Sequence, residues 1–127
     1  MSGRNVSRAA GVMRQGSQFE AVQRTGSRIA SRNFVLRAAP NGEAHPRLGI
    51  IAGKKTAARA VDRNRARRLI RVAFRETAPQ IGAYDVTIQL RNDLRSELNP
   101  SVREELRDLL ETLVRRVSDY APRSDRQ

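Results

Sequence analysis

The chain has 127 residues, which suits one domain, and no cysteine, which excludes a disulfide scaffold and a thiolate metal site and fits a reducing compartment. Its formal net charge is +12, and 23 of its 25 basic residues are arginine because lysine occurs only as Lys54 and Lys55. We find neither a signal peptide nor a segment near the roughly 20 apolar residues of a membrane span, so we expect a cytoplasmic protein without membrane contact.

The N-terminal part of the chain predicts a tail followed by a short helix. Residues 1–12 are basic and small without a strong period, so we expect a flexible tail. A helix from Ser17 would place Phe19 and Val22 on one face, and Gly26 would end it.

Two stretches after this helix are typical of strands. In "RNFVLRAAPNG", Phe34 and Leu36 share one face while Val35 and Arg37 share the other, and Pro-Asn-Gly signals a turn. The apolar run "RLGIIAG" at 47–53 predicts a second, buried strand, and the lysine pair follows it directly.

A basic helix is predicted over residues 59–77, with Pro79 ending it. At 100° per residue, one side forms an apolar stripe that should enter the core: Ala66, Leu69, Ile70, Ala73, Phe74 and Thr77. The opposite side carries Asn64, Arg65, Arg68, Arg71 and Arg75, and Arg67 flanks it.

The basic side of this helix lacks the mixed charges of an ordinary solvated face. Asp62 stands at its start and Glu76 at its end, with only cations between them. Like-charge neighbours such as Arg68 and Arg71 cost free energy in isolation, and a phosphate backbone would offset that cost. Nucleic acid is favoured over an anionic membrane, because membrane-binding helices need a bulky apolar face free to insert.

The last third predicts a strand and a helix. "AYDVTIQL" alternates, with Tyr84, Val86, Ile88 and Leu90 inward and Asp85, Thr87 and Gln89 outward. Residues 101–104 form a capping box, and the helix behind it should bury apolar side chains up to Val117. We expect a flexible tail over 118–127. The fold class is therefore α/β, an α+β sandwich of one sheet and packed helices.

Residues 45–75, "HPRLGIIAGKKTAARAVDRNRARRLIRVAFR", resemble the signature of the bacterial ribonuclease P protein subunit family. The signature runs from a strand through a lysine pair into an Arg-Asn-Arg helix, matched here by Lys54-Lys55 and Arg63-Asn64-Arg65. Weaker similarity extends over 13–117, which we expect to form the RNA-binding domain. The resemblance implies a four-stranded sheet and three helices in the order α-β-β-β-α-β-α, with a left-handed β-α-β crossover.

The resemblance also implies a function in 5′ maturation of tRNA. The family's protein binds a large catalytic RNA, and the complex removes 5′ leaders from precursor tRNA. Mg²⁺ held mainly by the RNA does the chemistry, so the protein alone should be inactive. No obligatory protein partner is expected.

Two groups of site residues follow from the resemblance. Those assigned to the catalytic RNA are Arg63, Asn64, Arg65, Arg67, Arg68, Arg71 and Arg75; those assigned to the leader are Phe19, Arg37, Lys54, Lys55 and Arg91. Gln23 and Arg37 depart from the family pattern, since aromatics are usual at both positions. The leader-binding site should therefore rely more on charge and guanidinium stacking. Phe19 has an alternative reading as a residue that anchors the first helix.

Three other functions fit parts of the sequence. A self-sufficient nuclease needs converging carboxylates, and Asp62, Glu76, Asp85 and Asp93 show no paired spacing, while the lone His45 sits in a loop. A helix-turn-helix DNA binder needs two helices joined by a tight turn, whereas strands flank this basic helix. A structural RNA-binding protein of ribosomal type would share this composition, and only the motif at 45–75 distinguishes it from a ribonuclease P protein subunit.

Overall fold

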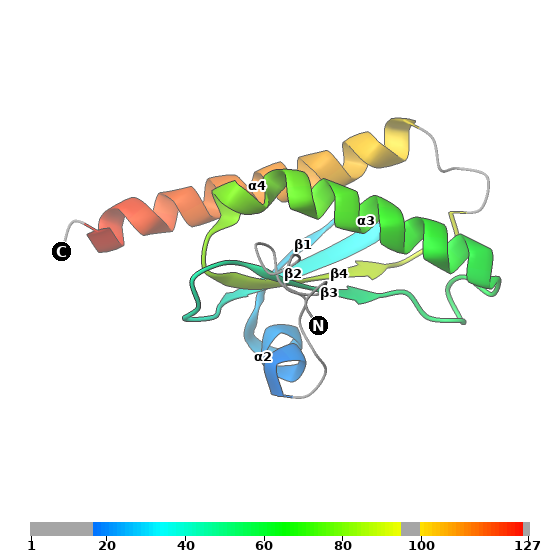
Figure 1. The fold of residues 1–127 in the computed structure, drawn as a ribbon, viewed down its shortest axis with the longest axis horizontal. Coiled ribbons are helices and arrows are strands. Elements are labelled where there is room, and N and C mark those ends of the chain that lie inside the picture. Colours follow the sequence, from blue (N-terminus) through cyan, green and yellow to red (C-terminus); the bar gives the residue numbers. More distant parts are fainter. Residues whose placement is uncertain (1–16, 95–99, 126–127) are drawn as a thin grey trace, which may run out of the picture.

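The computed structural model describes residues 17–94 and 100–125, with side chains described over 20–24, 26–94 and 101–117. The elements are α2 (Ser17–Thr25), β1 (Ser27–Ala30), β2 (Phe34–Pro40), β3 (Arg47–Ile51), α3 (Ala60–Ile81), β4 (Tyr84–Leu90) and α4 (Pro100–Asp125). This sequence of elements confirms the predicted order. Figure 1 shows α3 and α4 together on one side of the sheet and α2 on the other.

The four strands form one mixed sheet in the order β1-β2-β4-β3. β2 runs antiparallel to both β1 and β4, whereas β3 is parallel to β4, and α3 makes the crossover between this parallel pair. Because β3 and β4 are parallel, both end at the same edge of the sheet. The segments that follow them, including Lys54, Lys55 and Arg91, therefore begin at that edge.

The main core lies between the sheet and the pair α3 and α4. Alternate strand residues such as Leu36 and Ile88 are fully buried, and they pack with Ile70 of α3 and Leu110 of α4. Each such side chain contributes about 1.5–3 kcal/mol through its removal from water. The predicted inward faces of β2 and β4 are thereby confirmed.

The opposite face of the sheet is less exposed than the strand alternation predicted. Asp85 and Thr87 were expected to point to solvent, yet they are only 5% and 1% exposed. The Thr87 hydroxyl donates a hydrogen bond to Oε1 of Gln23 on α2, at 2.9 Å. Asp85 accepts hydrogen bonds from Arg47 at 2.8 and 2.9 Å and from Asn41 at 3.0 Å. The expectation was wrong because α2 covers Thr87, while side chains of the neighbouring strand and loop surround Asp85.

Two helix boundaries also differ from the sequence prediction. α3 does not end before Pro79 but continues through it to Ile81, because Ala78 and Ile81 are buried and hold the last turn on the core. Gly82, at φ 82°, then ends the helix in a conformation that favours glycine. α4 begins at Pro100, so Ser101 lies inside the first turn, and the helix runs past residue 117 to Asp125.

The junction of α2 and β1 depends on a close approach of backbone that only glycine allows. A Cβ on Gly26 would lie 2.6 Å from the Val22 carbonyl oxygen and 3.0 Å from that of Ala38. The Gly26 N–H donates to the same Val22 carbonyl at 2.9 Å, so the helix end cannot shift without losing this bond.

We predict that Gly26→Ala destabilises the fold by about 1–3 kcal/mol, the usual cost of overpacking. Gly53→Ala is the matched control, because a Cβ there meets nothing within 4 Å. Urea unfolding followed by circular dichroism measures both. Equal stability of the two variants would contradict the close contact at Gly26.

Candidate nucleic-acid interface

One face of α3 presents cations to solvent along its length. The exposed members, which we call the basic face, are Asn64, Arg65, Arg68, Arg71 and Arg75. The buried residues of the helix recur every four positions and determine this orientation, since side chains four apart share a helix face: Ala66, Ile70, Phe74 and Ala78. The structure confirms the predicted division of the helix into an apolar and a basic side.

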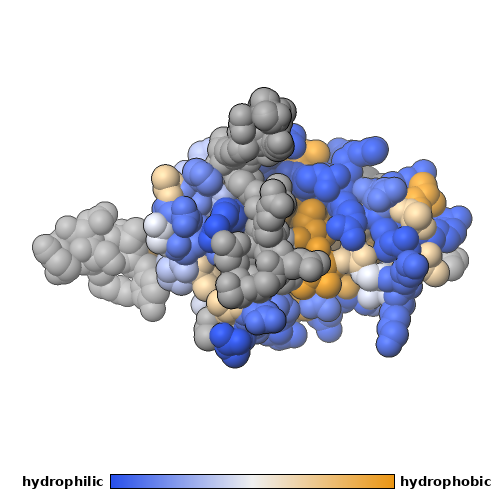
Figure 2. Space-filling model, turned by 60° about the horizontal axis from the view of Figure 1, so that its bottom comes forward, coloured by the Kyte–Doolittle hydropathy of each residue, from blue (hydrophilic) through white to orange (hydrophobic). Residues whose placement is uncertain are grey.

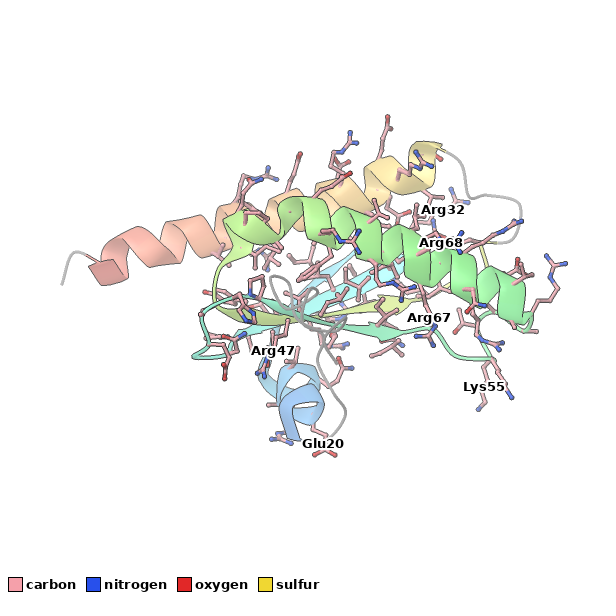
Figure 3. All side chains as sticks on the ribbon, viewed as in Figure 1. Glu20, Arg32, Arg47, Lys55, Arg67 and Arg68 are labelled. Atoms are coloured by element: carbon pink, nitrogen blue, oxygen red, sulfur yellow. The ribbon has the colours of Figure 1, made fainter. Side chains whose placement is uncertain are left out.

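Arg63 and Arg67 belong to the predicted set but lie elsewhere on the helix. Both are half-buried. Nη1 of Arg63 donates to the backbone carbonyls of Ala57 and Ala58 at 3.0 and 2.9 Å, and Arg67 reaches the carbonyl of Ala52 at 3.5 Å. Arg67 and Arg68 leave α3 on opposite sides (Figure 3). These two arginines therefore hold the β3–α3 loop against the helix.

The carboxylate at the start of α3 is already paired. Asp62 is 2% exposed, and its oxygens accept hydrogen bonds from Arg59 at 2.7 and 3.1 Å. The hydrogen bond from Arg59 to Asp62 raises the pKa of the guanidinium above its ordinary value. An acid in the first turn also suits the helix dipole. Asp62 thus balances Arg59 and leaves the charge of the basic face unmatched.

The sheet edge where β3 and β4 end gathers three further predicted cations. Lys54 and Lys55 are exposed in a turn whose Thr56 and Ala57 N–H groups donate to the carbonyl of Gly53 (Figure 3). Arg91 follows β4, and its Nη1 donates to the carbonyl of Ser31 at 2.8 Å. The structure therefore brings these cations to the edge at which α3 also begins.

The predicted leader residues are divided between this edge and the sheet face that carries α2. Arg37 of β2 is half-buried there and stands in one cross-strand row with Arg28 of β1 and Thr87 of β4. Seen from this side, the surface has an apolar strip bordered by hydrophilic residues (Figure 2). Phe19 lies in α2, but its side chain is outside the described residues.

Two arginines of α4 join the basic surface without having been predicted. Arg103 and Arg107 line a groove together with Arg65 and Arg68 of α3. Their spacing places them on one side of α4, but α4 also carries exposed acids, so its sequence reads as an ordinary solvated helix. Only the packing of α4 beside α3 reveals their position.

The described residues do not form a metal centre. In that part of the chain no group of three or more His, Cys, Asp or Glu side chains could hold an ion. The carboxylates of Asp62, Asp85 and Glu105 each accept hydrogen bonds from neighbours on the protein, and they lie on three different elements. The helices in the same ranges include none long and apolar enough to cross a membrane.

Comparison with known proteins identifies the family to which this architecture belongs. A family model described as Ribonuclease P matches residues 8–114. The chain is 36% identical over 97 residues to the ribonuclease P protein component of Idiomarina loihiensis, covering 76% of this chain and 78% of that protein. It is 37% identical over 100 residues to that of Pseudomonas aeruginosa, covering 77% and 73%. The chain belongs to the ribonuclease P protein family.

Solved structures of ribonuclease P proteins share the fold. The protein from Thermotoga maritima superimposes with a TM-score of 0.67 at 26% identity, covering 83% of this chain and 96% of that one. The protein from Staphylococcus aureus gives 0.67 at 27% identity, covering 85% and 95%. Family membership makes this chain a subunit of a tRNA-processing endoribonuclease, and it decides against a ribosomal protein or a helix-turn-helix DNA binder.

We predict that the two sides of α3 respond oppositely to truncation. Ile70→Ala should cost about 2–5 kcal/mol of unfolding free energy, because Ile70 is fully buried. Arg68→Ala should change stability by no more than about 0.5 kcal/mol, because its side chain is exposed. Thermal unfolding of both variants measures the difference. A similar loss in the two variants would contradict the assignment of the faces.

Proposed function

We propose that this protein binds the catalytic RNA of ribonuclease P through the basic face of α3 and the 5′ leader of precursor tRNA along the sheet face that carries α2. The observation that carries the proposal is the row of exposed cations on α3, held outward by the burial of Ala66, Ile70 and Phe74. Family membership supports the choice of the ribonuclease P RNA and precursor tRNA as the partners.

The basic face suits a folded RNA because its charges lie along one straight helix. Arg65, Arg68, Arg71 and Arg75 recur every three or four positions, so phosphates along a backbone can be met in succession. Arginine presents a planar fork that matches phosphate oxygens and also stacks on bases. Bound phosphates would remove the like-charge repulsion between neighbouring guanidiniums.

The α2 side suits a single strand because it combines an apolar strip with cations. Single-stranded RNA is held by stacking surfaces and a positively charged groove. The apolar strip in Figure 2 offers a surface for bases, and Arg37, with Lys54, Lys55 and Arg91 at the edge, offers charge for the backbone. Gln23 stands where the family pattern has an aromatic residue, and its side chain accepts a hydrogen bond from the Thr87 hydroxyl. Gln23 therefore holds α2 on the sheet and does not offer a stacking surface for a base.

The protein's contribution to the reaction is binding and orientation. The catalytic step is assigned to Mg²⁺ held by the RNA, and the described carboxylates do not fit a metal site of their own. Binding the leader favours precursor over mature tRNA, because the product has lost the segment that this surface contacts. No obligatory protein partner is proposed.

Binding of the catalytic RNA should weaken steeply with salt. Four or more phosphate contacts would give a log-log slope of about −3 or steeper, from the release of about 0.7–0.9 counterions per phosphate. Arg68→Ala should weaken binding by roughly 1.5–3 kcal/mol, as expected for a charge-assisted hydrogen bond, and flatten this slope. Filter binding at several salt concentrations measures both, with Arg116→Ala on the exposed side of α4 as the control. A flat salt dependence would exclude phosphate contacts.

Precursor and mature tRNA should be affected differently by changes on the α2 side. Arg37→Ala and Phe19→Ala, tested in the complex reconstituted with the catalytic RNA, should each weaken precursor binding several-fold and leave mature tRNA binding unchanged. The reason is that only the precursor carries the single strand that these residues would meet. The protein alone should cleave no precursor. Equal losses for both tRNAs would place the two residues outside the leader site.

A further inference from the structure

A groove between α3 and α4 adjoins the basic face and is distinct from the sheet face that carries α2. The two helices lie side by side on the same side of the sheet (Figure 1), and they border an open groove of about 370 Å³. Its apolar lining includes Leu69, Val72 and Leu106. Val72 is 43% exposed, which is unusual for a large aliphatic side chain on so basic a helix. The cavity has the size and apolar lining of a small-ligand site.

The groove is bordered by guanidiniums from both helices. Arg65 and Arg68 of α3 and Arg103 and Arg107 of α4 line it. Glu76 contributes the one carboxylate among the lining residues, two turns further along α3 than Arg68. An apolar partner protein would desolvate four cations without pairing them, which is costly. The lining therefore fits a ligand that is flat and apolar in one part and anionic in another.

We propose that an unpaired nucleotide of the catalytic RNA inserts its base into this groove. The base would lie on Val72 and Leu69, and the flanking phosphates would pair with the arginines of the two helices. The carboxylate of Glu76 accepts hydrogen bonds and repels phosphate, so it selects a base with an exocyclic amino group over a phosphate at its end of the groove. This inference rests on the proposed function, because it names a contact of the same RNA partner.

The position of the groove assigns it to the catalytic RNA and not to the leader. Arg65 and Arg68 belong to both the basic face and the groove, so RNA on the basic face lies beside the opening. The sheet separates this groove from α2 and from the strip proposed for the leader (Figure 1).

The test is a titration of the full-length protein with the catalytic RNA alone, using variants matched in pairs. Val72→Ala should weaken binding about fivefold or more, because it removes two aliphatic carbons that would be buried against the base, without changing the salt slope. Val61→Ala should have no effect, because Val61 is the other large aliphatic residue that is exposed in the described ranges, at 48%, and does not line the groove. Arg107→Ala should weaken binding and reduce the salt slope by about one, whereas Arg116→Ala, two and a half turns further along and on the opposite side of α4, should not.

Glu76→Ala distinguishes a base from a phosphate in the groove. A bound base that donates its amino group to Glu76 predicts weaker binding of the catalytic RNA after this change. Tighter or unchanged binding would overturn the proposed base contact, because removing a negative charge favours a phosphate ligand. Circular dichroism of each variant checks the fold.

The outcomes separate this inference from the proposed function. If the wild-type protein fails to bind the catalytic RNA, the proposed function itself is wrong. If the wild type binds while Val72→Ala and Arg107→Ala behave like their controls, only the groove contact is overturned. A single base of the catalytic RNA that becomes accessible to dimethyl sulfate in the Val72→Ala complex, and not in the Val61→Ala complex, would support it.

Discussion

The packing of α3 on the sheet is the constraint on which the other features depend. Ala66, Ile70, Phe74 and Ala78 bury one stripe of the helix, so the residues between them have no freedom to turn inward. The same contact places the start of α3 at the edge where β3 and β4 end, beside the lysine pair. A hydrophobic interaction therefore orients a polar surface, and the exposed cations of the basic face do not hold the helix in place.

Charge on this protein is paired where it supports the fold and unpaired where it faces outward. Arg47 pairs with Asp85 and Arg59 with Asp62, and in both cases the hydrogen bond to the carboxylate raises the pKa of the guanidinium. The salt bridges among the described residues include none of the basic-face arginines, and the repulsion between neighbouring arginines lowers the stability of the free protein. A polyanion that binds this face relieves the repulsion. The folded protein therefore presents an RNA-binding surface that lowers its own stability when it is free.

Local periodicity in the sequence predicted the two sides of α3 and the strands β2, β3 and β4, whereas the third strand before α3, β1, followed only from the resemblance to the ribonuclease P protein family. The prediction failed where a segment distant in sequence determines a residue's environment. Thr87 is buried beneath α2, where it donates a hydrogen bond to Gln23, and α3 continues through Pro79 because Ile81 is buried in the core. Arg107 was missed for the same reason, since its role depends on which helix packs beside α4. Arg63 and Arg67 were assigned to the site by the resemblance, but their bonds to loop carbonyls could not be predicted from spacing.

The central claim is that two sides of the molecule contact two different RNAs, and site-specific crosslinking tests it directly. The chain has no cysteine, so one introduced thiol carries the photoreactive group alone. Asn64→Cys would place it on the basic face and Gln89→Cys on the α2 side of the sheet. In the complex with catalytic RNA and precursor tRNA, the first should label the catalytic RNA and the second the 5′ leader. Labelling of the same RNA from both positions would contradict the account.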